Sequence, residues 1–81
     1  MSPTVMKIGP FRFYFYSNEG LEPPHIHVQD GKKSAKFWLE SGELAYSVNF
    51  SAHELNKIKV LIKENKDTFM EAWHEFIKQR K

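Results

Sequence analysis

The sequence predicts an α+β fold in which an antiparallel sheet of four to five strands is followed by two helices. In the first half of the chain, apolar and polar residues alternate, as they do in strands with one buried face. The connections between these runs are too short for a parallel crossover, so neighbouring strands are expected to be antiparallel. The second half repeats apolar residues at helical spacing. We therefore expect a strand meander with both helices packed on one face of the sheet.

Five short runs carry the strand pattern. In chain order they are Thr4–Ile8, Phe11–Tyr16, a run around His25–Gln29, Lys33–Glu40 and a last run around Leu44–Val48. Turn signals separate several of them, namely Gly9-Pro10, Asp30-Gly31 and Ser41-Gly42. Pro23-Pro24 fixes the start of the third run, because proline cannot donate a ladder hydrogen bond and holds the chain extended.

The alternation assigns the side chains of these runs to two faces. One face is expected to form the core with Phe11, Phe13, Phe15, Ile26 and Val28. Unless something covers it, the other face should display Arg12, Tyr14, Tyr16, His25, His27, Gln29, Lys36 and Trp38 together. A candidate binding surface is therefore expected on the side of the sheet away from the helices.

The helices are expected after a capping box, Ser51-Ala52-His53-Glu54, in which serine and glutamate each bond to the other's backbone amide. The first helix is interrupted at Glu64-Asn65-Lys66, and the second is expected from about Asp67. Apolar residues recur along the second helix at helical spacing: Phe69, Met70, Trp73, Phe76 and Ile77. This stripe places Trp73 in the core.

Length and composition limit the classes of protein to consider. A chain of 81 residues allows one domain, spanning 1–81, with a core that is only marginally large, so a small protein partner or a homodimer is expected. With no cysteine, disulfides and thiolate metal sites are excluded. No signal sequence or membrane-spanning stretch is recognised, which favours a cytoplasmic protein without membrane contact. The net charge of +2 permits RNA binding without arguing for it.

The pair His25 and His27 is the main candidate for chemistry. On a strand, residues two apart share a face, and their Cα atoms lie about 6.5 Å apart. Two such imidazoles could act as acid and base in metal-independent cleavage of RNA. In that case Arg12, Lys36 or Lys33 would bind phosphate, and aromatic residues would stack on bases: Tyr14, Tyr16 and Trp38.

Two other interpretations stay open. The pair His25 and His27 could hold a metal ion, but the candidates for a further ligand are scattered: His53, Glu22 and Asp30. No cofactor is expected on this basis. Alternatively, the two histidines are half-buried strand residues bonded to backbone or to Glu19 or Glu22, and the aromatic face is a protein interface. The remaining His74, like His53, is expected at the surface.

Several of these stretches together resemble a family of small bacterial proteins, domain-of-unknown-function family 4160. The matching features are Pro3-Thr4, Arg12 to Glu19, Pro23-Pro24-His25-Ile26-His27-Val28, Ala35-Lys36-Phe37-Trp38-Leu39 and Glu71-Ala72-Trp73-His74-Glu75. The resemblance implies a bacterial cytoplasmic protein encoded beside another small protein, an arrangement similar to toxin–antitoxin operons. It implies no particular activity.

These observations lead to one expectation and two alternatives. The expectation is an interaction protein, one component of a toxin–antitoxin-like pair, that acts through the face carrying His25 and His27. The first alternative is a metal-independent endoribonuclease that uses the same two histidines as its acid and base. The second is a metal-binding module built on them.

Overall fold

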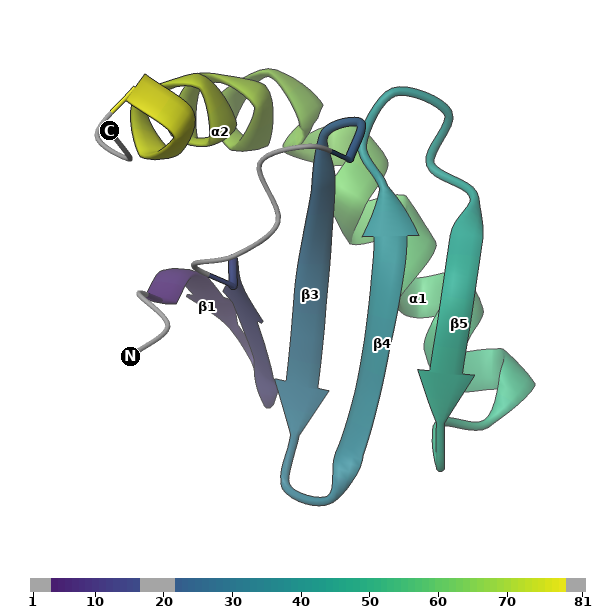
Figure 1. Ribbon diagram of the computed structural model, residues 1–81. Coiled ribbons are helices and arrows are strands. Elements are labelled where there is room, and N and C mark those ends of the chain that lie inside the picture. The colour runs from purple at the N-terminus through teal and green to yellow at the C-terminus, as the bar shows by residue number, and fades with distance from the viewer. Residues whose placement is uncertain (1–3, 17–21, 79–81) are drawn as a thin grey trace.

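Five strands form one antiparallel sheet, and two helices follow, in the computed structural model (Figure 1). The structure describes residues 4–16 and 22–78. The strands lie in chain order across the sheet: β1 (Thr4–Ile8), β2 (Phe11–Tyr14), β3 (His25–Asp30), β4 (Lys33–Trp38) and β5 (Leu44–Val48). The helices are α1 (Ala52–Glu64) and α2 (Lys66–Lys78). The predicted α+β meander is confirmed.

The predicted turns hold the hairpins together. At Gly31, between β3 and β4, φ is 61°, a left-handed conformation that glycine adopts without steric cost. β4 ends at Trp38, two residues earlier than expected, and the next amide, that of Leu39, donates to Pro24 O at 3.0 Å. Proline has no amide hydrogen to return that bond, so the ladder cannot continue past this point.

The capping box at the start of α1 is confirmed. The Ser51 hydroxyl accepts from the Glu54 amide at 3.1 Å, and the Glu54 carboxylate accepts from the Ser51 amide at 2.9 Å. At the other end, the Asn65 side chain donates to Leu61 O at 2.8 Å, which satisfies a carbonyl of the last turn. α2 then begins at Lys66, one residue before the expected start.

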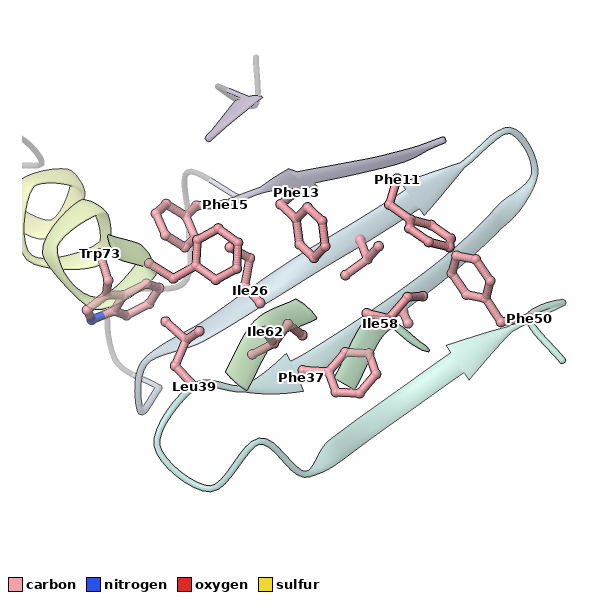
Figure 2. Close-up of a cluster of buried hydrophobic side chains, with 13 residues drawn as sticks. Phe11, Phe13, Phe15, Ile26, Phe37, Leu39, Phe50, Ile58, Ile62 and Trp73 are labelled. Carbon is pink, nitrogen blue, oxygen red and sulfur yellow. The ribbon is translucent and has the colours of Figure 1, made fainter. Parts of the chain in front are cut away.

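The core lies between the sheet and the two helices. Figure 2 shows the phenylalanine rings of β2 and the residue after it on the same side of the sheet as Ile58, Ile62 and Trp73. Phe13 packs against Phe69 of α2, with ring centroids 5.2 Å apart, and Phe15 packs against Trp73 at 5.3 Å. The predicted core face is therefore confirmed, including the place of Trp73 in the core.

α1 and α2 cover different parts of this face. α1 lies behind β4 and β5, whereas α2 runs across the end of the sheet at which β3 begins (Figure 1). Among the described residues, neither helix is long and apolar enough to cross a bilayer. The two histidines lie on the other face of the sheet, which α1 does not cover and which α2 reaches at His25 through Trp73.

Candidate functional site

The face of the sheet opposite α1 carries the candidate site, and we call it the open face. Cross-strand partners share a face, and the register places Tyr14 beside His27, His27 beside Lys36 and Lys36 beside Tyr46. Neighbouring rows pair Arg12 with Gln29, His25 with Trp38 and Ser34 with Val48. The open face consists of these residues together with Tyr16, whose ring lies 4.4 Å from that of His27.

The two histidines lie side by side, as their spacing predicts. Their ring centroids are 5.3 Å apart, and the rings are nearly perpendicular, at 85°. However, His25 is 0% exposed and His27 is 1% exposed. The expectation that this face displays them is therefore wrong, and so is the interpretation that they are only half buried.

Tyrosine rings cover His27. The Tyr14 ring stacks on the imidazole with its centroid 5.4 Å away, and the Tyr16 ring meets it edge-on at 4.4 Å. Tyr14 is itself buried, at 6% exposure, so the expectation that it is displayed is also wrong. Large aromatic neighbours from β2 and the residues after it thus remove His27 from solvent.

His25 is enclosed from two elements. The Trp73 indole of α2 lies 4.9 Å from the imidazole, and the Trp38 ring of β4 lies 5.8 Å away. The Nδ1 atom of His25 is 2.9 Å from Pro23 O, and because a carbonyl oxygen only accepts, Nδ1 donates this bond. Glu22 comes within 3.8 Å of the same nitrogen. Glu19, the other carboxylate expected here, lies outside the described residues.

The two cations of the open face are engaged within the chain. The Lys36 ammonium pairs with the Glu22 carboxylate and lies 4.8 Å from the centroid of the Trp38 ring. Lys36 is only 8% exposed, which corrects the expectation that it is displayed. It is therefore buried with its charge compensated.

Arg12 is held in a similar way. Its Nε donates to the Thr4 hydroxyl at 2.7 Å, and its Nη1 donates to Gln29 Oε1 at 3.0 Å. The guanidinium also lies 4.4 Å from the centroid of the Tyr14 ring. These contacts fix the guanidinium against the sheet.

The Tyr14 hydroxyl is perturbed by its surroundings. Burial raises the pKa of Tyr14 well above its usual value, and a 3.5 Å hydrogen bond to the Tyr16 hydroxyl adds to the increase. The nearby Arg12 charge acts in the opposite direction but is the weaker effect. Tyr14 therefore stays neutral and contributes packing and hydrogen bonding rather than an ionisable group.

Lys33 does not join the open face. Its ammonium pairs with the Glu54 carboxylate at 2.7 Å, at the start of α1. This contact raises the pKa of Lys33 and lowers that of Glu54, chiefly through the hydrogen bond between them. The residue that was a candidate for binding phosphate instead joins β4 to α1.

Three large side chains of the open face are exposed. Tyr16 is 43% exposed, and two residues that the site prediction omitted, Tyr46 and Val48, are 47% and 49% exposed. The period-two pattern of Leu44–Val48 was the available signal for them. It could not assign their face, because the pairing of β4 with β5 shifts register between Lys36 and Phe37.

The other two histidines lie apart from this pair. His53 and His74 are exposed on α1 and α2, as expected. Across residues 4–16 and 22–78, no group of three or more His, Asp or Glu side chains is arranged to hold a metal ion. Thus the structure brings none of the proposed further ligands into such a group with His25 and His27.

Comparison with known proteins gives one match. The model of a family described as a domain of unknown function, DUF4160, matches residues 11–74. This range includes both histidines, β2 to β5, α1 and most of α2. No curated protein and no solved structure shows significant similarity to the chain.

Proposed function

The chain belongs to the DUF4160 family, and we propose that it is a bacterial cytoplasmic interaction protein which binds a small protein through its open face. We further propose that the two proteins form a toxin–antitoxin-like pair. The observation that carries the binding role is the contrast on this face between the buried pair, His25 and His27, and the exposed Tyr16 beside them. The histidines support the surface, and the aromatic rim that Tyr16 and Trp38 form beside them is available to a partner.

The chemistry of this rim fits a protein partner. Tyrosine and tryptophan are favoured anchors of protein interfaces because they bury a large area and lose few rotamers on binding. Tyr16 and Trp38 flank the histidine pair on the open face. Arg12 and Lys36 already bond to groups of the same chain, so they offer less to the phosphates of RNA than two free cations would.

The burial of the histidines speaks against the endoribonuclease alternative. A general base must come within about 2.6–3.2 Å of the proton that it removes. Tyr14 and Tyr16 cover one imidazole, and Trp38 and Trp73 pack against the other, so a ribose hydroxyl has no direct approach. For the metal-binding alternative, the described residues add no supporting ligand group.

The test is binding of the small protein expected to be encoded beside this one. The two proteins are co-expressed and co-purified, and the affinity is measured for the parent chain, Tyr16→Ala and Val60→Ala. Tyr16 and Val60 are both exposed, at 43% and 53%, but Val60 lies on α1, away from the open face. We expect Tyr16→Ala to weaken binding about tenfold or more, because an interface aromatic is lost, and Val60→Ala to leave it unchanged.

Induced expression in bacteria tests the toxin–antitoxin part. We expect growth to change when this chain or its neighbour is expressed alone and to recover when both are expressed. Equal affinity of Tyr16→Ala and parent would rule out the open face as the binding surface. Cleavage of cellular RNA by the parent, lost in a folded His27→Phe variant, would establish the endoribonuclease instead.

A further inference from the structure

β5 forms an open edge of the sheet. The strand order ends with β5, and in Figure 1 no described strand lies on its outer side. An edge strand presents a row of backbone amide and carbonyl groups that another strand can pair with. The chemistry of this edge therefore suits an additional β-strand.

The side chains of β5 do not protect this edge against pairing. Edge strands are usually protected by lysine, proline, a bulge or a covering segment. Leu44–Val48 contains neither a charged residue nor proline. β5 does carry the bulge of its pairing with β4, because Tyr46 and Leu44 oppose the consecutive residues Lys36 and Phe37, but Tyr46, Ser47 and Val48 pair regularly beyond it. β1, at the opposite edge, also has a register shift, between Thr4 and Met6, but in addition it has an exposed lysine, Lys7. The two edges of the sheet thus differ.

Exposed apolar residues gather on the β5 edge. Three of the five exposed large hydrophobic residues of the described chain belong to β5: Leu44, Tyr46 and Val48, at 40%, 47% and 49%. Tyr46 and Val48 share the open face, because their cross-strand partners are Lys36 and Ser34. An edge with two apolar side chains on one face is suited to a strand that carries the same pattern.

We propose that β5 pairs with β5 of a second copy of this chain, antiparallel and centred on Ser47. A two-fold axis at Ser47 sets Tyr46 of each copy opposite Val48 of the other copy. Both exposed apolar residues therefore gain an apolar neighbour on the same face. The two Ser47 side chains meet on the helix side, where Ser47 faces the small Ala35. No like charges are opposed within Leu44–Val48.

Other two-fold registers fit less well. Centring the pair on Tyr46 would set Val48, on the open face, against Leu44, whose partner Phe37 belongs to the core face. Opposed residues of an antiparallel pair lie on the same face, so that register is mismatched. The Ser47 register joins two five-stranded sheets into one and leaves the Tyr16 side of each open face accessible. Formation of this dimer therefore does not depend on the small protein partner proposed above.

The mass of the protein in solution tests this proposal. The mass measured by light scattering should rise with protein concentration and approach twice the chain mass of 9.6 kDa. Val48→Glu should weaken self-association about tenfold or more, because two carboxylates would be desolvated against apolar groups. Val60→Glu is the matched control, since Val60 is equally exposed but lies on α1, and it should behave as the parent.

A mixing experiment tests the register. Val48→Glu and Tyr46→Lys should each be weak dimers alone, whereas their mixture should form a heterodimer in which glutamate faces lysine in one of the two cross-strand pairs. Amide hydrogen exchange of residues 44–48 should slow as the parent concentration rises. A parent that stays monomeric at its highest soluble concentration would refute the proposal, as would a dimer unaffected by Val48→Glu. Failure of the mixture to associate would refute the Ser47 register.

Discussion

The imidazole of His25 packs against the indole of Trp73, with ring centroids 4.9 Å apart. This contact joins the first residue of β3 to the middle of α2, and it encloses a histidine that is 0% exposed. Removing the ring would leave a cavity and take the donor from Pro23 O. His25 is therefore expected to have a large structural role.

His25→Ala is predicted to destabilise the fold by about 3 kcal/mol, from the cavity and the lost hydrogen bond together. Urea unfolding followed by circular dichroism measures this change. His74→Ala, at an exposed position of α2, is the control and should stay within about 0.5 kcal/mol of the parent. Equal stability of the two variants would contradict the packing role of His25.

The aromatic ring of His27 is predicted to contribute to stability through packing. Tyr14 and Tyr16 pack on it with centroids 5.4 Å and 4.4 Å away, so His27→Phe should retain more stability than His27→Ala. Urea unfolding of both variants decides this. A catalytic imidazole would be lost in either variant, so activity that survives in His27→Phe would argue against acid–base chemistry at this residue.

Tyr14 is predicted to ionise later than an ordinary tyrosine. Because burial, with help from the Tyr16 hydrogen bond, raises its pKa in the folded state, the unfolded chain releases this proton first. The stabilising contribution is present below the unfolded pKa of about 10 and is lost as pH rises through the folded-state pKa. Tyrosinate absorbance during an alkaline titration should show a late step that is absent from Tyr14→Phe. If Tyr14→Phe kept the late step and lost only a tyrosine that ionises at the ordinary pH, the prediction would be contradicted.

The Lys33–Glu54 ion pair is predicted to make the free energy of unfolding depend on pH in the acid range. The hydrogen bond from Lys33 lowers the pKa of Glu54 in the folded state. The stabilisation by this pair is therefore present above the unfolded pKa of about 4.3 and is lost as pH falls through the folded-state pKa. Glu54→Gln keeps a residue that suits the capping box but loses the charge, and it should flatten this part of the stability curve.

Ser51→Ala separates the cap from the charge. It removes the hydroxyl that accepts from the Glu54 amide and should cost about 1 kcal/mol, with little dependence on pH between 5 and 8, a window clear of the usual carboxylate pKa of about 4. Chemical unfolding at several pH values compares the two variants. If Glu54→Gln and the parent lost stability in parallel on acidification, the ion pair would not be the cause.

The sequence predicted the fold well because the signals for it are local. Period-two alternation identified the strands, short connections made them antiparallel, and the Ser51–Glu54 box marked the start of α1. The core face of Phe11, Phe13 and Phe15 followed from the same alternation. Strand ends were less accurate, since they depend on which backbone groups of neighbouring strands still find partners.

The candidate site was predicted only in part. Alternation correctly placed His25, His27 and Tyr14 on one face, but it carries no information about what covers that face. Coverage came from rings of other elements, with Trp73 of α2 packed on His25 and the rings of Tyr14 and Tyr16 packed on His27. The compensation of Lys36 by Glu22 likewise joins β4 to the residues before β3.

The sequence by itself thus determined the order of the elements, the core and the adjacency of His25 and His27, because each depends on the spacing of residues along one strand or helix. The tertiary structure decided that the histidines are buried and that Tyr46 and Val48 are exposed at an edge. Exposure depends on contacts between elements and on the register shift beside Lys36, and neither can be determined from a local pattern.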